Sequence, residues 1–94
     1  MRGEIIKPGE ICSQTIDLPS GERERIDYLR DLVGGHIETV PMPGAKYMCV
    51  FEDAKLYKQT INVEATAMAI EAESISELDY IAGTVVIVPS EALA

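Results

Sequence analysis

Two adjacent glycines, Gly34 and Gly35, separate a helical pattern from a strand pattern, and this junction is the strongest constraint on the fold. Before the glycines, apolar residues recur with the spacing of one helix face, at Ile26, Leu29, Leu32 and Val33. Gly34 suits the left-handed position that ends many helices, and Gly35 lets the chain reverse closely. β-branched residues between His36 and Val40 then predict a strand. We therefore expect a helix to end at Val33 and a strand to follow at once.

Proline and glycine turns divide the rest of the chain into short strands and one further helix. Helices are expected at residues 22–33, with Ser20 as N-cap, and at 62–72, and strands within residues 1–7, 11–18, 37–42, 46–51 and 83–89. The uncharged strand of residues 83–89 should lie centrally, and residues 90–94 should form a tail. The order predicts one α+β domain over residues 1–94, with a mostly antiparallel sheet of four to five strands and two helices packed on one face.

The second helix, Asn62 to Ala72, is apolar around most of its circumference, so it must be covered on more than one side. Either the sheet and the first helix cover it, or another subunit does. One stripe is assigned to the protein's own core, at Val63, Ala67 and Ile70. The remaining surface is assigned to an oligomer interface, at Ala65, Met68, Ala69 and Ala72. We therefore expect a homo-oligomer, most simply a homodimer that buries this apolar surface.

The net charge of −8 is concentrated in the last third of the chain. Residues 59–94 contain no Lys or Arg and six acidic residues, of which five form a candidate partner-binding surface: Glu64, Glu71, Glu73, Glu77 and Asp79. Such a surface repels phosphate backbones, so direct binding to nucleic acid is not expected. It suits a basic protein, including one whose groove normally holds nucleic acid. The simpler interpretation is that these residues keep a small protein in solution.

Residues that would support catalysis are sparse. The chain lacks the phosphate-binding, dinucleotide-binding and metalloprotease motifs, and its one histidine, His36, has no partner at metal-ligand spacing. The paired carboxylates Glu52 and Asp53 are interpreted as solvated turn residues. Cys12 and Cys49 are far apart and are expected to be unlinked thiols. We expect no enzyme activity, no catalytic residue, no metal and no cofactor, and, because no apolar run could span a membrane, a cytoplasmic protein.

Four segments in a fixed order carry a resemblance to a known family. They are Leu29-x-x-Leu32-Val33-Gly34-Gly35-x-Ile37-Glu38-x-Val40, Glu52-Asp53-x-Lys55-Leu56, Asn62-x-x-Ala65-Thr66 and Ile81-x-Gly83-x-Val85-Val86-Ile87-Val88. This pattern resembles a family of small uncharacterised domains encoded by bacteriophages, prophages and plasmids. The resemblance covers the core, residues 22–88, and leaves residues 1–18 as an added N-terminal pair of strands. It implies a mobile-element context, in which small acidic proteins often act by binding host factors.

Three functional hypotheses follow. The first is a non-enzymatic accessory protein of a phage or other mobile element, which inhibits a host factor such as a nuclease or a CRISPR-type defence complex in the host cytoplasm. The second is an oligomeric sponge that binds a nucleotide signal; its candidate ligand residues are Arg30, His36, Lys55, Asn62 and Thr66. The third is a structural or regulatory subunit. The residues name neither the host target nor the ligand.

Overall fold

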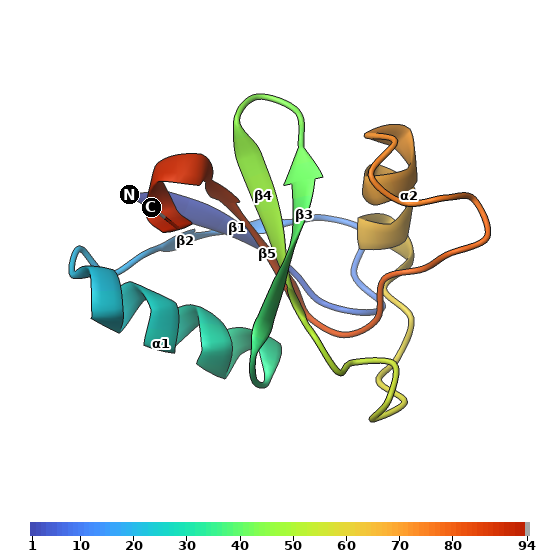
Figure 1. The fold of residues 1–94 in the computed structure, drawn as a ribbon, viewed down its shortest axis with the longest axis horizontal. Helices are drawn as coiled ribbons and strands as arrows, with labels where there is room; N and C mark the ends of the chain where they lie inside the picture. Colours follow the sequence, from blue (N-terminus) through green and yellow to red (C-terminus); the bar gives the residue numbers. More distant parts are fainter. Residues whose placement is uncertain (94) are drawn as a thin grey trace.

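Five antiparallel strands form one sheet in the computed structural model, which describes residues 1–93 (Figure 1). The elements are β1 (Arg2–Ile6), β2 (Gln14–Asp17), α1 (Glu22–Val33), β3 (Ile37–Met42), β4 (Lys46–Phe51), α2 (Val63–Glu71), β5 (Val85–Pro89) and the 3₁₀ helix η1 (Ser90–Leu93). The order of strands in the sheet is β2-β1-β5-β4-β3, so β5 is central as predicted. The predicted α+β class is confirmed. Of residues 1–93, no helix is long and apolar enough to cross a bilayer.

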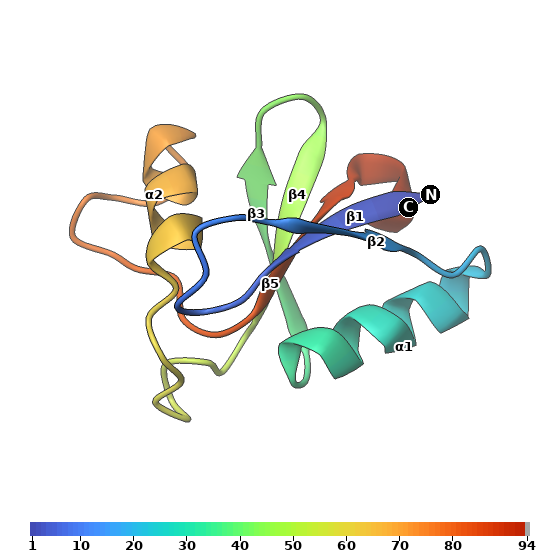
Figure 2. The ribbon, with the colours of Figure 1, turned by 180° about the vertical axis from the view of Figure 1, so that it is seen from behind.

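The two helices lie on opposite faces of the sheet, and the prediction that they share one face is wrong (Figures 1 and 2). Strand β5 shows why. Its residues Val85 and Ile87 pack in the core that contains α2, whereas Val86 and Val88 pack in the core that contains α1. A strand that is apolar at every position presents apolar side chains to both faces, so each face needs its own cover.

Helix α1 begins and ends at glycines. Its N-cap is Gly21 rather than the expected Ser20, and the carboxylate of Glu24 occupies the space where a side chain at position 21 would lie. At the other end Gly34 has a φ of 105°, and its N–H donates to the carbonyl oxygen of Arg30, as the C-cap prediction required. The helix buries Leu29 and Val33 against the sheet.

A buried arginine ties α1 to the C-terminal segment. Arg25 is 6% exposed, and its Nε donates to the carbonyl oxygen of Ala92 at 2.8 Å. Its guanidinium also donates to the carbonyl oxygens of Pro19 and Ser20. Residues 90–93, expected as part of a tail, therefore form η1 and cover the α1 face, with Ala92 fully buried. Ala94, the last residue of that expected tail, lies outside the described residues.

Helix α2 is positioned by its N-cap, Asn62, which is fully buried. The Asn62 side-chain oxygen accepts from the N–H of Ala65, while its amide nitrogen donates to the carbonyl oxygens of Ile6 and Gly83 at 3.0 and 2.9 Å. One side chain therefore holds α2 against the ends of β1 and the segment before β5. This anchor places Ala65 and Ala69 against the sheet and leaves Val63 73% exposed.

Candidate functional site

Exposed apolar side chains concentrate on one part of the molecule, which we call the α2 end. It consists of α2, the loop of residues 52–61 that precedes it and the loop of residues 72–82 that follows it. Helix α2 itself lies away from α1 in both ribbon views (Figures 1 and 2). Of the eight large apolar residues that are exposed, six belong to it: Leu56, Tyr57, Ile61, Val63, Leu78 and Tyr80. Leu78 is 97% exposed, so the rest of residues 1–93 leaves it almost completely uncovered.

The predicted acidic surface belongs to the same α2 end. Glu64 is half-buried, and the other four candidate residues, Glu71, Glu73, Glu77 and Asp79, are exposed. Glu73 has a φ of 59°, a left-handed conformation that is unfavourable for residues other than glycine, and it ends α2. Leu78 lies in the sequence between Glu77 and Asp79. Apolar and acidic side chains are therefore exposed next to each other in the loop of residues 72–82.

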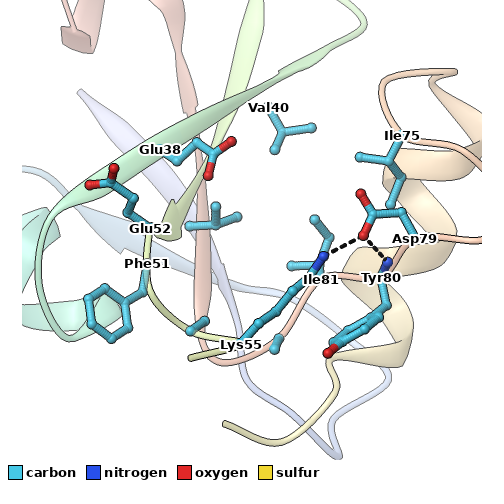
Figure 3. Close-up of a pocket in the computed structure, with 12 residues that line it drawn as sticks. Glu38, Val40, Phe51, Glu52, Lys55, Ile75, Asp79, Tyr80 and Ile81 are labelled. Atoms are coloured by element: carbon cyan, nitrogen blue, oxygen red, sulfur yellow. Dashed lines mark hydrogen bonds and ion pairs between the residues drawn. The ribbon is translucent and has the colours of Figure 1, made fainter. Parts of the chain in front are cut away.

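A cavity of about 140 Å³ lies at this end, between the β3–β4 hairpin and the loop of residues 72–82 (Figure 3). Its apolar lining includes Val40, Val50, Ile75 and Ile81. Charged groups line the same cavity from both sides: Glu38 and Glu52 from the hairpin, and Lys55 and Asp79 from the two loops. Glu38 is two residues from Val40, and Glu52 is two residues from Val50, and both valines pack in the core beneath α2. Because side chains alternate between the two faces of a sheet, Glu38 and Glu52 also project from the face that carries α2.

On one side of the cavity the protein supplies its own cation, the side chain of Lys55. The Lys55 ammonium pairs with the carboxylate of Asp79 and lies 4.5 Å from the centre of the Tyr80 ring. The backbone N–H of Tyr80 donates to the same carboxylate oxygen at 2.7 Å. The hydrogen bond from Lys55, and then that from Tyr80, hold the pKa of Asp79 below its ordinary value. An aromatic face and a carboxylate together stabilise a cation at this position.

The five residues predicted to bind a small ligand do not converge. Arg30 lies on α1 and His36 in the connection to β3, both exposed, whereas Lys55 belongs to the α2 end. Asn62 is fully used as the anchor of α2. The Thr66 hydroxyl donates to the carbonyl oxygen of Asn62 at 2.8 Å and accepts from the N–H of Ile81 at 2.9 Å. Asn62 and Thr66 therefore stabilise the fold, and Arg30 and Lys55 line different cavities.

The structure leaves only part of the predicted oligomer interface accessible, since Met68 and Ala72 are partly exposed. Ala65 and Ala69 have no exposed surface, and Met68 packs against the core cluster beneath α2. The stripe assigned to the core has the opposite orientation, because Val63 and Ala67 are exposed. Because small or flexible apolar residues lie on most sides of this helix, its sequence pattern does not show which side faces the core. The hydrogen bonds of Asn62 fix that orientation instead. The homodimer stays a prediction, and Ala65 and Ala69 cannot contribute to its interface.

The remaining candidates for chemistry stay dispersed. Among residues 1–93, no group of three histidine, cysteine, aspartate or glutamate side chains is arranged to hold a metal ion. Cys12 is exposed and Cys49 is buried, and both are free thiols. Burial raises the pKa of the Cys49 thiol from 9.0 to about 11, so this group stays protonated at neutral pH.

Sequence reasoning missed the exposed apolar residues of the α2 end. The signal was present, because Leu56, Tyr57 and Leu78 stand among polar residues in segments predicted as turns. An apolar residue in a loop has no sheet or helix face to bury it, so it either packs locally or stays exposed. Tyr57 packs locally in part, because its ring stacks on that of Phe51 with 5.7 Å between the ring centres, whereas Leu78 stays exposed.

Comparison with protein-family models, curated proteins and solved structures found no match to this chain.

Proposed function

We propose that this chain is a non-enzymatic binding protein, an accessory factor of a mobile element that inhibits a host protein through its α2 end. The observation that carries the proposal is the mixture of uncovered apolar side chains with carboxylates on that surface. Uncovered apolar residues that gather in one place are typical of interaction sites, whereas single ones are ordinary.

Leu78 is the expected anchor of the interaction. It is 97% exposed at the tip of a loop, and burial of a leucine side chain contributes about 1.5–3 kcal/mol. Interfaces depend on a few such anchors that enter pockets on the partner. The neighbouring carboxylates of Glu77 and Asp79 would then select a partner whose pocket is rimmed by Lys or Arg.

The class of partner follows from charge. A protein with a net charge of −8 and an acidic last third is attracted to basic surfaces and repelled by phosphates. A host nuclease or a nucleic-acid-guided defence complex has such a basic groove, and the mobile-element resemblance supports this target class. A nucleotide sponge finds no support in the geometry, since its candidate residues do not converge.

Affinity capture from a bacterial host lysate, followed by mass spectrometry, tests the proposal. We expect wild-type protein to retain a basic protein, with retention falling as salt increases. Leu78→Ser should abolish capture, and Glu77→Lys should weaken it. Asp27→Lys, which makes the same charge change on exposed α1, is the control and should bind normally. Equal retention by all three variants would exclude the α2 end as the binding surface.

A further inference from the structure

The cavity at the α2 end is sized for one amino-acid side chain. Its volume of about 140 Å³ is below the roughly 300–1,000 Å³ of pockets that enclose nucleotides and other drug-sized ligands. Its lining combines apolar side chains, among them Val40 and Ile75, with charged groups at both sides (Figure 3). A matching ligand therefore has an apolar stem and a charged end.

The charge at the cavity is negative. Glu38, Glu52 and Asp79 contribute three carboxylates and Lys55 one ammonium, which leaves a formal charge of −2. Lys55 pairs with Asp79. The other ion pair within residues 1–93 joins Arg2 to Asp17, so neither Glu38 nor Glu52 has a cationic partner.

The two unpaired carboxylates lie on neighbouring strand positions. Glu38 is paired in register with Val50, and Glu52 follows two residues later, where its N–H donates to the carbonyl oxygen of His36. Diagonal neighbours on one sheet face are within reach of long side chains, and both of these carry a negative charge. A cation that enters the cavity would offset this negative charge, while its stem would contact the apolar lining.

From this geometry we propose that the cavity receives a basic side chain, an arginine, of the partner protein; the proposal rests on the binding function above. Glu38 and Glu52 hold the guanidinium, whose planar fork suits two carboxylates. Its methylene stem packs in the cavity beside Val40 and Ile75. Lys55, over Tyr80, shows that the opposite wall already stabilises a cation. Because the Lys55 ammonium also repels an incoming cation, it limits the affinity of the cavity.

Two small probes test this site without the partner: Nα-acetyl-arginine amide and the neutral, nearly isosteric Nα-acetyl-citrulline amide. In ¹H–¹⁵N NMR titrations we expect the arginine probe to shift the amide signals of residues 38–40, 50–55 and 75–82. Glu38→Gln and Glu52→Gln should each weaken binding by about two- to fivefold, the range for exposed ion pairs. Lys55→Met should strengthen it by a similar factor. Glu22→Gln, which makes the same charge change on an exposed residue of α1 outside the cavity lining, is the control and should change nothing.

Equal shifts with arginine and citrulline, or equal weakening by Glu22→Gln, would overturn the site. Weaker binding in Lys55→Met would overturn the role given to Lys55. The capture experiment separates the two proposals. If the arginine probe does not bind and Leu78→Ser still abolishes capture, the cavity proposal fails alone. If the probe binds in the cavity but the protein captures no host protein through its α2 end, the proposed inhibitory function fails, and the cavity remains a site that binds a cation.

Discussion

Arg25 and Ala92 are 67 residues apart in sequence, and a hydrogen bond of 2.8 Å from the Arg25 Nε to the Ala92 carbonyl oxygen joins them inside the protein. Within residues 1–93, no carboxylate pairs with this buried arginine; its partners are backbone carbonyl oxygens. Arg25 therefore holds η1 against α1, and we expect this contact to contribute to the stability of the core on that face of the sheet.

We predict that Arg25→Met lowers the free energy of unfolding by about 1.5–3 kcal/mol, because the substitution removes charged hydrogen bonds and leaves the buried carbonyl oxygen of Ala92 unpaired. Urea unfolding followed by circular dichroism measures the change. Arg23→Met on exposed α1 is the matched control and should stay within about 0.5 kcal/mol of wild type. Similar stability of both variants would show that the Arg25 contacts contribute little.

Asn62 supports a second prediction. Asn62→Ala removes the cap of α2 together with both donors to Ile6 and Gly83, and should cost about 2–4 kcal/mol. Asn62→Asp keeps the capping oxygen and removes only the donors. If the bridging bonds matter as much as the cap, the aspartate variant will also be destabilised. A wild-type melting temperature for Asn62→Asp would assign the whole effect to capping.

Two residues with positive φ should respond in opposite directions. Gly34→Val should lower stability by more than about 1 kcal/mol, since a β-branched residue fits a φ of 105° poorly. Glu73→Gly should raise stability by about 0.5–1 kcal/mol, because it relieves a strained left-handed conformation. Glu71→Gly, two residues earlier within α2, is the control and should be destabilising. Thermal unfolding of the three proteins gives the comparison, and equal signs for Glu73→Gly and Glu71→Gly would contradict it.

The two thiols should differ in reactivity. In native protein at pH 8, iodoacetamide should modify exposed Cys12 and spare Cys49, whose pKa is raised to about 11 by burial. Because the folded state holds the Cys49 proton more tightly than the unfolded state, stability should be intact below the ordinary thiol pKa. It should decline as the pH rises from there toward 11. Mass spectrometry counts the labels. Two labels without denaturant at pH 8 would contradict the buried position, and Cys49→Ser should remove only the label acquired on unfolding.

The elements that depend on local signals were predictable from the sequence. The sequence also indicated that both faces of the sheet need cover, but the prediction of the helix positions did not take this into account. Helix α1 and strands β3 and β4 begin and end where the sequence placed them, because glycines, prolines and apolar periodicity act within a few residues. The four consecutive apolar residues of β5, Val85 to Val88, already required cover on both faces. Placing both helices on one face ignored that requirement.

The parts that failed depend on distant contacts. Arg25 looked like one more solvated charge on α1, and its acceptor at Ala92 is visible only once the chain is folded. The inward face of α2 was set by bonds from Asn62 to β1 and to Gly83, which no helical periodicity encodes. The acidic residues of the candidate site were identified from composition. Leu78 and the cavity were missed because exposure and shape are properties of the tertiary structure.

The central position of β5 also has a consequence for biosynthesis. The β1–β2 and β3–β4 pairs are made first, and each has one strand that pairs with β5. Until residues 85–89 leave the ribosome, the edges of β1 and β4 that pair with β5 have no partner strand, and the two apolar faces of the sheet are incomplete. The sheet therefore forms late during synthesis, in a step that joins both halves at once, and chaperones have the greatest opportunity to bind the chain just before that step.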